Sequence, residues 1–383
     1  MLVARGLPLP RLFGGKRLRL ASDSINGLCE RVATDLGSVR AIPFARGSTA
    51  IYALMRALAI RDGPGEVVMP SLCCETVAMA IVYAGHDVVF ADVSPQTLCM
   101  SPETVAPLVS GRTRAVIIVH LYGMDAQAQR FAALRALNPH MLLVEDIAQA
   151  VGGRTIDGRP LGGTLDASIL SFAADKILRG NGGMLTIGQG AAFFADVDVM
   201  SSARQHAASG LQPQMAASLR NLVHGLVDIA RAHETADVSG RWREAMHDYR
   251  DLIVRKGALT QPNLTEACLD QIEGIRAERF SKYYIYRDRI EPTAGHVLQF
   301  HPDSTCWRCP ILMADAERSR EVTAQLRSAG VHASNHYFPL DRLFFDGRLP
   351  NSAAAASRII NLWVDELASP WMVDRAVEII NCR

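Results

Sequence analysis

The sequence predicts a doubly wound α/β domain followed by a smaller α+β domain. Short runs rich in Val and Ile alternate with helix-like segments from about residue 45 to 190, which is typical of a parallel sheet covered on both faces. The periodicity is helical from about 190 to 250, and helices alternate with strands beyond it. With 383 residues, two domains are expected, and we place them at residues 1–250, including an N-terminal extension, and 251–383.

The predicted strands of the first domain are short apolar runs, each four residues or fewer in length. Segments such as 49–60 and 126–137, which lie between these runs, have apolar residues at helical spacing. The predicted strands lie at residues 67–69, 88–90, 116–119, 142–144, 168–170 and 184–187.

The segment from 190 to 250 contains an apolar stripe at spacings of three and four. We interpret it as a helix that packs on the core or on a second subunit; membrane association is the alternative, although the opposite face has few basic residues. In the last part, a helix over 316–329 is predicted to end at Gly330, before a strand at 331–333. The stripe consists of Leu219, Leu222, Val223, Leu226, Ile229 and Ala230.

The charge and hydropathy patterns favour a small-molecule substrate. The chain has 40 Lys and Arg against 39 Asp and Glu, so no overall positive field attracts nucleic acid or acidic membranes. The first 20 residues lack the apolar run and the cleavage site of a secretory signal, and no stretch is long and apolar enough to span a membrane. We therefore expect a mature cytoplasmic protein with no nucleic-acid or membrane partner.

Eight cysteines in a chain of this size do not indicate a disulfide framework. The spacing of Cys306 and Cys309 is open to two interpretations: a redox pair or half of a zinc site, or thiols on a strand that leads into residues 310–313. A zinc site requires a second pair of ligands, which adjacent Cys73 and Cys74 do not supply. We expect free thiols and no metal.

Polar residues directly after a strand are candidates for a binding site, because ligands of doubly wound sheets bind beyond the carboxyl ends of the strands. His120 follows one predicted strand, Glu145 and Asp146 follow another, and Ser171 follows a third. Buried carboxylates require partners to stay ionised, and a protonated pyridine nitrogen is such a partner for Asp146. The alternative is a structural acid paired with Arg or with backbone amides.

Residues 47–50 (Gly-Ser-Thr-Ala) open an apolar helix, which brings free N–H groups, two hydroxyls and the positive end of the helix dipole together. A phosphate suits such a place, although Ser or Thr before a helix is commonly only an N-cap. Lys176 follows a strand beside the glycine-rich residues 180–184, where it can reach a pocket as an imine-forming amine; taken alone, such a residue is more commonly a solvated surface lysine. The order of phosphate cradle, aspartate and lysine matches the contacts of pyridoxal phosphate.

With these motifs the chain resembles the DegT/DnrJ/EryC1/StrS sugar aminotransferases, within fold type I of the pyridoxal phosphate enzymes. The resemblance runs from about residue 40 to the end and is strong to about 190. It rests on the following segments: 47–50, 63–71, 83–85, 90–93, 119–123, 145–150, 171–176 and 182–184, with weaker likeness at 204–206 and 330–340.

The resemblance implies a large domain with a mostly parallel seven-stranded sheet and a role for each matching residue. Lys176 forms the imine with the cofactor and moves the substrate proton, Asp146 holds the pyridine nitrogen, and Gln149 contacts the hydroxyl side of the ring. The phosphate is implied to bind at Gly47, Ser48, Thr49 and Ser171.

Two departures from the family pattern concern the same pocket. Cys74 stands where the family usually has the aromatic residue that stacks on the cofactor ring. The Asn-Tyr-Arg that a family subunit lends to its neighbour's site is not recognisable; Asn263 is the nearest asparagine.

The implied reaction is transfer of an amino group from an amino-acid donor, L-glutamate by analogy, to a keto sugar, nucleotide-linked or a related cyclic ketone. The resemblance also implies a homodimer with shared active sites. The alternatives are a sugar dehydratase on the same fold, which usually has histidine in place of the lysine, and a homologue that binds pyridoxal phosphate without catalysis.

Overall fold

The computed structural model describes residues 21–191, 213–232, 237–255 and 257–382. Its larger sheet has seven strands in the order β1-β7-β6-β5-β4-β2-β3. The five adjacent strands β6-β5-β4-β2-β3 are parallel to one another. Strand β7 runs antiparallel to both of its neighbours, β6 and β1. The strands are β1 (Arg40–Phe44), β2 (Glu66–Pro70), β3 (Asp87–Ala91), β4 (Thr113–Val119), β5 (Leu142–Asp146), β6 (Ala167–Ser171) and β7 (Gly183–Ile187).

The six strands that the apolar runs predict are all present, and the mostly parallel seven-stranded sheet is confirmed. Their burial explains why the runs are continuous: the side chains of β4 from Ala115 to Val119 are at most 4% exposed, because helices cover both faces of the sheet. The seventh strand, β1, lies outside the predicted set. It is an edge strand that contains Pro43, and a proline inside a strand is best tolerated at the edge of a sheet.

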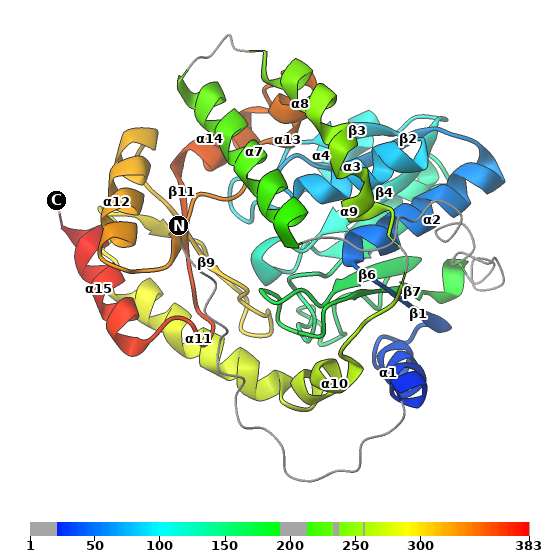
Figure 1. Cartoon of the computed structure of the whole chain (residues 1–383), viewed down its shortest axis with the longest axis horizontal. Coiled ribbons are helices and arrows are strands. Elements are labelled where there is room, and N and C mark those ends of the chain that lie inside the picture. Colours follow the sequence, from blue (N-terminus) through cyan, green and yellow to red (C-terminus); the bar gives the residue numbers. More distant parts are fainter. Residues whose placement is uncertain (1–20, 192–212, 233–236, 256, 383) are drawn as a thin grey trace.

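The helices connect and cover the strands, as Figure 1 shows. Short 3-10 segments are also present, and one of them, Ala128–Ala136, replaces the helix predicted over 126–137. The helices of the large-sheet half are α1 (Ala21–Asp35), α2 (Gly47–Asp62), α3 (Glu75–Ala84), α4 (Pro102–Val105), α7 (Pro213–Ala232), α8 (Val238–Met246) and α9 (Arg250–Ile253). The other 3-10 segments are Ala106–Leu108, Leu121–Gly123, Gln189–Ala191 and His247–Tyr249.

The later part of the chain forms a second, antiparallel sheet with the strand order β10-β11-β9-β8 (Figure 1). The predicted helix before Gly330 is present as α12, and Gly330 has a positive φ of 77°. The strands are β8 (His296–Val297), β9 (Cys309–Leu312), β10 (Ala333–Ser334) and β11 (Ile359–Leu362). The helices are α10 (Pro262–Asp270), α11 (Ile272–Arg289), α12 (Ala316–Ser328), α13 (Leu340–Phe345), α14 (Pro350–Arg358) and α15 (Pro370–Asn381). The exact division at residue 250 remains a proposal.

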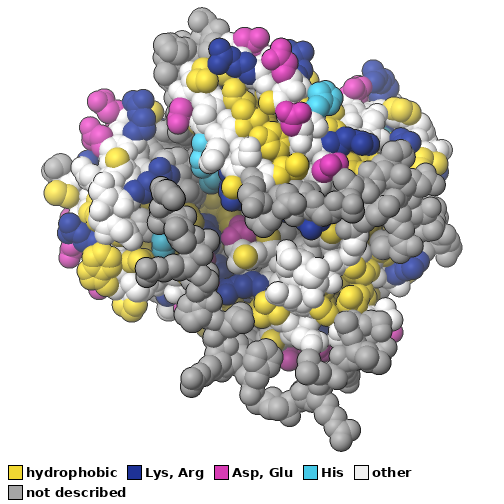
Figure 2. Space-filling view, viewed as in Figure 1, with side chains coloured by type: hydrophobic (Ala, Val, Ile, Leu, Met, Phe, Trp, Pro, Cys, Tyr) yellow, Lys and Arg dark blue, Asp and Glu magenta, His cyan; other side chains and the backbone are white. Residues whose placement is uncertain are grey.

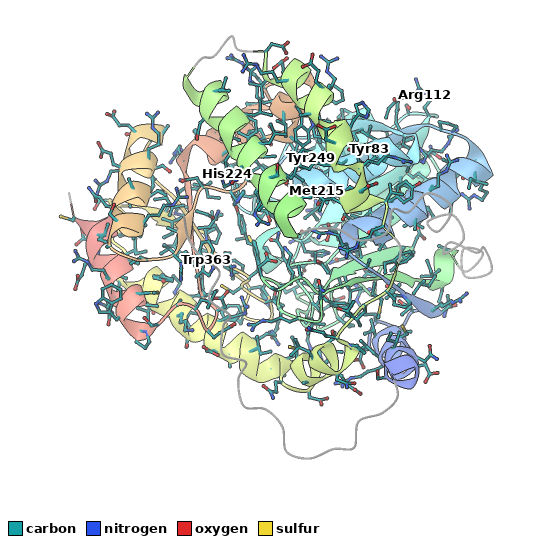
Figure 3. The ribbon with its side chains drawn as sticks, viewed as in Figure 1. Tyr83, Arg112, Met215, His224, Tyr249 and Trp363 are labelled. Carbon is teal, nitrogen blue, oxygen red and sulfur yellow. The ribbon has the colours of Figure 1, made fainter. Side chains whose placement is uncertain are left out.

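Helix α7 carries the predicted apolar stripe and packs in the core. Leu219, Val223 and Leu226 are buried in the same apolar cluster as the large sheet, which is one of the two packing arrangements that the stripe predicted. A later segment contacts α7, because the Tyr249 hydroxyl lies 3.0 Å from that of Ser218. Tyr83 of α3, labelled with Tyr249 in Figure 3, donates to a carbonyl at the end of α8 and so joins α8 to α3. No helix in the described ranges is long and apolar enough to cross a membrane.

Candidate active site

The predicted strand-end residues meet at one edge of the large sheet. Asp146 is the last residue of β5 and Ser171 the last of β6. Gly183 begins β7 opposite Ser171, and Phe44 ends β1 opposite Gly183. The antiparallel β7 therefore brings the end of β1, and the helix that follows it, to the same edge as the ends of the parallel strands.

The start of α2 lies directly against this edge. Gly183 has no room for a side chain, because a Cβ atom there would collide with the backbone of Arg46 and the amide nitrogen of Gly47. A Cβ atom on Gly47 would lie 3.2 Å from the Cβ of Ser171. These close approaches place the free N–H groups of the helix start beside Ser48 and Ser171, where they can bind an anion.

Thr49 does not turn its hydroxyl toward this cradle. The side chain is fully buried, and Oγ1 donates to the carbonyl of Ile253 at 2.8 Å. Ile253 belongs to α9, which packs against α2 and α3, so the hydroxyl ties two helices together. Of the three hydroxyls that were predicted to bind the phosphate, those of Ser48 and Ser171 line the cavity and stay available to an anion.

Lys176 projects from the turn after β6 into the same cavity. The turn is fixed by Phe172, whose N–H donates to Gly182 and whose carbonyl accepts from Asn181 at 2.7 Å. The side chain of Lys176 is 15% exposed, and its Nζ lies 3.7 Å from Oδ2 of Asp175. The amine is thus held near solvent but inside a structured pocket.

Trp307 forms a wall of the cavity that the sequence analysis missed. Lys176 Nζ lies 4.4 Å from the centre of the Trp307 ring, and the indole Nε1–H donates to the carbonyl of Asp175 at 2.7 Å. Trp307 precedes β9 of the second sheet, and its own N–H donates to Tyr122 at 2.7 Å. No sequence signal joins Trp307 to Lys176, because they are far apart along the chain.

Asp146 is buried at the bottom of the cavity. Burial raises its pKa above the ordinary value, although the N–H of Ala148, 2.9 Å from Oδ1, and the nearby Lys176 act in the opposite direction. Among the described residues, the N–H of Ala148 is the one hydrogen-bond donor to its carboxylate. A buried carboxylate with so few partners favours a cationic group placed against it.

Glu145, beside Asp146, has a structural role. It is fully buried and accepts hydrogen bonds from the N–H groups of Gly162, Thr164 and Leu165, and from the Thr164 hydroxyl at 2.7 Å. His120 Nε2 lies 3.2 Å from its Oε2. Burial by itself raises the pKa of Glu145, but these hydrogen bonds and His120 outweigh it, and the pKa is lowered. The alternative of a structural acid therefore holds for Glu145.

Gln149 lies at the cavity wall with both ends of its amide bonded. Its Oε1 accepts from the N–H of Tyr122 at 2.6 Å, and its Nε2 donates to the hydroxyl of Tyr337 at 2.6 Å. Thr305, in the same loop as Trp307, donates to the carbonyl of Gln149 at 2.8 Å. The amide is therefore fixed in orientation by both halves of the chain.

Cys74 also lies at the cavity, at the N-cap of α3. Its Sγ is 3.1 Å from the hydroxyl of Thr76. Burial is the main cause that raises the pKa of Cys74, to about 12, so that it remains a neutral thiol. A small apolar side chain therefore occupies the position where the resemblance leads one to expect an aromatic ring.

The site consists of two adjoining cavities that share Lys176 and the start of α2. The inner cavity, about 80 Å³, contains Asp146, Gln149 and His120. The outer cavity, about 270 Å³, contains instead Arg46, Glu75, Arg220 and Trp307, with His336 and Tyr337. The inner cavity suits a small aromatic ring bonded to a carboxylate, and the outer one opens toward solvent.

The predicted free thiols are confirmed for the eight cysteines, and no group of three or more potential ligands able to hold a metal occurs among the described residues. Cys306 and Cys309 are both fully buried, and burial raises the pKa of each above its usual range. They lie before and at the start of β9, which agrees with the interpretation as packed thiols on a strand.

The comparisons with known proteins agree with this architecture. Residues 14–253 match the model of the DegT/DnrJ/EryC1/StrS aminotransferase family. The solved aminotransferase TlmJ from Streptoalloteichus hindustanus superposes with a TM-score of 0.70 at 22% identity, covering 94% of this chain and 90% of that one. This likeness confirms the predicted fold, that of the fold type I aminotransferases.

Curated relatives match a shorter part of the chain. A GDP-perosamine synthase of Caulobacter vibrioides is 35% identical over 152 residues, which is 39% of this chain and 40% of the relative. An L-glutamine:2-deoxy-scyllo-inosose aminotransferase of Streptomyces fradiae is 37% identical over 144 residues, 37% of this chain and 33% of the relative. Each match spans well under two thirds of the relative's length.

Proposed function

Because the chain belongs to the DegT/DnrJ/EryC1/StrS aminotransferase family, whose members use pyridoxal phosphate, we propose that it is a pyridoxal phosphate-dependent aminotransferase. It moves an amino group from an amino acid to a nucleotide-linked keto sugar or to a related cyclic ketone. The observation that carries this proposal is the presence of Lys176, Asp146 and the start of α2 around one cavity.

The residues around the inner cavity fit the cofactor. The N–H groups at Gly47 and the hydroxyls of Ser48 and Ser171 would hold the phosphate. Asp146 would pair with the protonated ring nitrogen, and this pairing would offset the burial that raises the pKa of the carboxylate. When bound, the cofactor supplies an electron sink for the carbanion that forms at the substrate carbon.

Gln149 and Cys74 would position the ring. The Gln149 amide is fixed by Tyr122 and Tyr337, so it presents one orientation to the hydroxyl side of the ring. The small Cys74 side chain would lie against one face of the ring, and its neutral thiol adds no charge to the site. Position 74 would therefore contact the cofactor ring through van der Waals packing and not through aromatic stacking.

Lys176 would carry the proton between substrate and cofactor. Its amine lies near the Trp307 ring and the Asp175 carboxylate, and Lys176 lines both the inner and the outer cavity. General acid–base catalysis requires the amine to lie within hydrogen-bonding distance of the proton that it transfers. Such catalysis contributes on the order of 10²–10⁴-fold in rate. Because Lys176 is present, the dehydratase alternative, which usually has histidine here, is less favoured.

The substrates are proposed from chemistry that neighbours the site. A third cavity, which shares Glu75, His336 and Tyr337 with the outer one, is lined by polar side chains such as His224, Asp228 and Asn335. His224 projects from α7, as Figure 3 shows, and its ring lies 5.3 Å from that of His336. Such polar walls suit an acceptor that carries hydroxyl groups. L-Glutamate is the first donor to test, and L-glutamine the second, since a relative's name specifies it.

The test is transfer of labelled nitrogen. Purified protein, pyridoxal phosphate and ¹⁵N-labelled donor are incubated with nucleotide-linked keto sugars and cyclic ketones, and products are analysed by mass spectrometry. A ¹⁵N-amine that is absent with Lys176→Ala supports the proposal. Loss of water without nitrogen gain favours the dehydratase, and no product with any pair favours a binding protein.

A dimer with shared sites stays a proposal as well, and sedimentation of the holoprotein tests it. On the face drawn in Figure 2, basic and acidic side chains are interspersed, in accord with the balanced composition and a small-molecule substrate.

A further inference from the structure

Two arginines line the outer cavity near Glu75, whose pKa their charges lower against the dominant effect of burial. Arg46 is the N-cap residue of α2 and is half-buried, while Arg220 projects from α7 and is exposed. Across the described ranges, neither guanidinium makes a hydrogen bond or an ion pair. An arginine that is partly withdrawn from water without a partner is costly, unless a ligand supplies the missing oxygens.

The charges around the outer cavity do not cancel. Lys176 lies 3.7 Å from Asp175, and this pair is neutral overall. The remaining charged groups in the lining are Arg46 and Arg220 against Glu75, so the formal balance is one positive charge. Burial is the main cause that lowers the pKa of Arg46. Nearby Arg255 and Arg220 act in the same direction, whereas Cys74 and Asp175 act against it.

We propose that Arg46 and Arg220 bind the α-carboxylate of the amino-acid donor. The inference rests on the proposed function and names the substrate group that the outer cavity receives. An arginine fork bonds the two oxygens of a carboxylate, and a single negative charge matches the balance of the lining. Both arginines line only the outer cavity, next to Lys176, where the donor's α-carbon must lie to exchange its proton.

The competing occupant is the phosphate of the cofactor. Gly47 and Ser48 line both cavities, so Arg46 is close in sequence to the phosphate cradle. A phosphate carries about two negative charges, which exceeds the single positive charge of the outer lining. The two occupants can be distinguished by experiment. If the donor binds here, the arginines bind its carboxylate; if the cofactor does, they bind its phosphate.

The experiment uses holoprotein and unreactive probes. Glutaramate has one carboxylate, glutaramide has none, and neither has an amino group that can react with the cofactor. Binding is measured by isothermal titration calorimetry for wild type, Arg46→Gln, Arg46→Lys and Arg220→Gln. Arg56→Gln is the matched control, because Arg56 is also a half-buried arginine of α2 but does not line the cavity.

The expected result is carboxylate-specific. Wild type and Arg56→Gln bind glutaramate and not glutaramide, Arg46→Gln binds glutaramate at least ~10-fold more weakly, and the exposed Arg220 contributes about 3-fold. Arg46→Lys retains the positive charge but not the two-pronged guanidinium, and its affinity for glutaramate is expected to lie between those of wild type and Arg46→Gln. Equal glutaramate affinity in wild type, Arg46→Gln and Arg220→Gln overturns the inference.

A second titration separates the carboxylate from the phosphate. Apoprotein variants are titrated with pyridoxal phosphate and with pyridoxal, which lacks the phosphate. Unchanged affinity for both in Arg46→Gln and Arg220→Gln is expected, whereas loss for pyridoxal phosphate alone assigns the arginines to the cofactor and overturns the inference. Failure of the proposed function itself is recognised separately, since wild type would then bind no cofactor at Lys176.

Discussion

The amine of Lys176 lies 4.4 Å from the centre of the Trp307 ring, and the indole N–H of Trp307 bonds the carbonyl of the preceding Asp175 at 2.7 Å. The guanidinium carbon of Arg308 also lies 4.4 Å from the centre of the Trp307 ring, and it is 4.3 Å from the centre of the Trp363 ring. Arg308 is buried and pairs with Asp365 at 2.8 Å. A stack of cations and rings thus runs from the second sheet to the proposed catalytic lysine.

This relationship predicts that Trp307 positions Lys176. Trp307→Ala removes the ring and the N–H donor, and we expect pyridoxal phosphate to attach about 10-fold more slowly, because a cation–π contact contributes roughly 0.5–2 kcal/mol. Trp307→Phe keeps an aromatic ring but not the N–H donor, and we expect it to slow the attachment by about half as much on a logarithmic scale. The rate is measured by absorbance after cofactor is added to apoprotein.

Trp371→Ala is the control for this series, because Trp371 is 58% exposed on α15 and does not line the cavity. The main-chain bond from Trp307 to Tyr122 does not depend on the side chain, so the loop keeps this anchor in every variant. Attachment at the wild-type rate in Trp307→Ala would contradict the positioning role.

The phosphate cradle predicts a contrast between neighbouring hydroxyls. Ser48→Ala and Ser171→Ala should each weaken pyridoxal phosphate binding about 5–10-fold and leave pyridoxal binding unchanged, because each removes one hydrogen bond to a charged group. Thr49→Val should leave the ratio of the two affinities unchanged. It should instead lower the free energy of unfolding by about 1–3 kcal/mol, because the buried carbonyl of Ile253 loses its donor.

Titration of apoprotein with both cofactors, together with urea unfolding, measures these effects. If Thr49→Val selectively lost affinity for pyridoxal phosphate, the position of its hydroxyl in this account would be wrong.

The close approach of Gly183 to the start of α2 predicts that a side chain at this position disturbs the phosphate cradle. Gly183→Ala places a methyl group against Arg46 and Gly47, and we expect a loss of about 1–3 kcal/mol in stability from overpacking. The displaced helix start should also weaken pyridoxal phosphate binding more than pyridoxal binding. Gly225→Ala, in open space on α7, should stabilise the protein by about 0.5–1 kcal/mol. Equal melting temperatures for the two variants would argue against the close approach.

Glu145 predicts a dependence of stability on pH. Its native pKa lies below the ordinary value of 4.5, so its contribution is complete above 4.5 and fades as the pH falls through the native pKa. Glu145→Gln should therefore cost about 3–5 kcal/mol at pH 7, and the difference from wild type should shrink in acid.

Urea unfolding of both proteins between pH 3 and pH 7 checks this sign. Glu378→Gln, an exposed partner of Arg375, serves as the control and should shift stability far less. A gap that widens on acidification would show that Glu145 is protonated in the native protein.

Much of the fold followed from the sequence because its physical causes are local. The strands of a covered parallel sheet are continuous apolar runs, and six of them were recognised; β1 was not, since an edge strand with Pro43 lacks that pattern. The helix over 126–137 forms as 3-10 turns, a difference that apolar spacing alone does not reveal.

The site was predictable where a polar residue directly follows a strand, as for Asp146 and Ser171. Other features depend on tertiary contacts. The direction of the Thr49 hydroxyl is decided by the carbonyl of Ile253, and Trp307 reaches Lys176 from a different sheet. The outer arginines belong to two helices whose approach no local pattern encodes.

The central claim is that one lysine holds the cofactor, and this chain makes the test unusually clean. It has four lysines: Lys16, Lys176, Lys256 and Lys282. Holoprotein is reduced with borohydride, digested and mapped by mass spectrometry. The account predicts the reduced pyridoxyl phosphate mass on Lys176 alone, with Lys282, paired to Glu278 at 2.8 Å, unmodified. Modification of any other lysine in place of Lys176, or none, would contradict it.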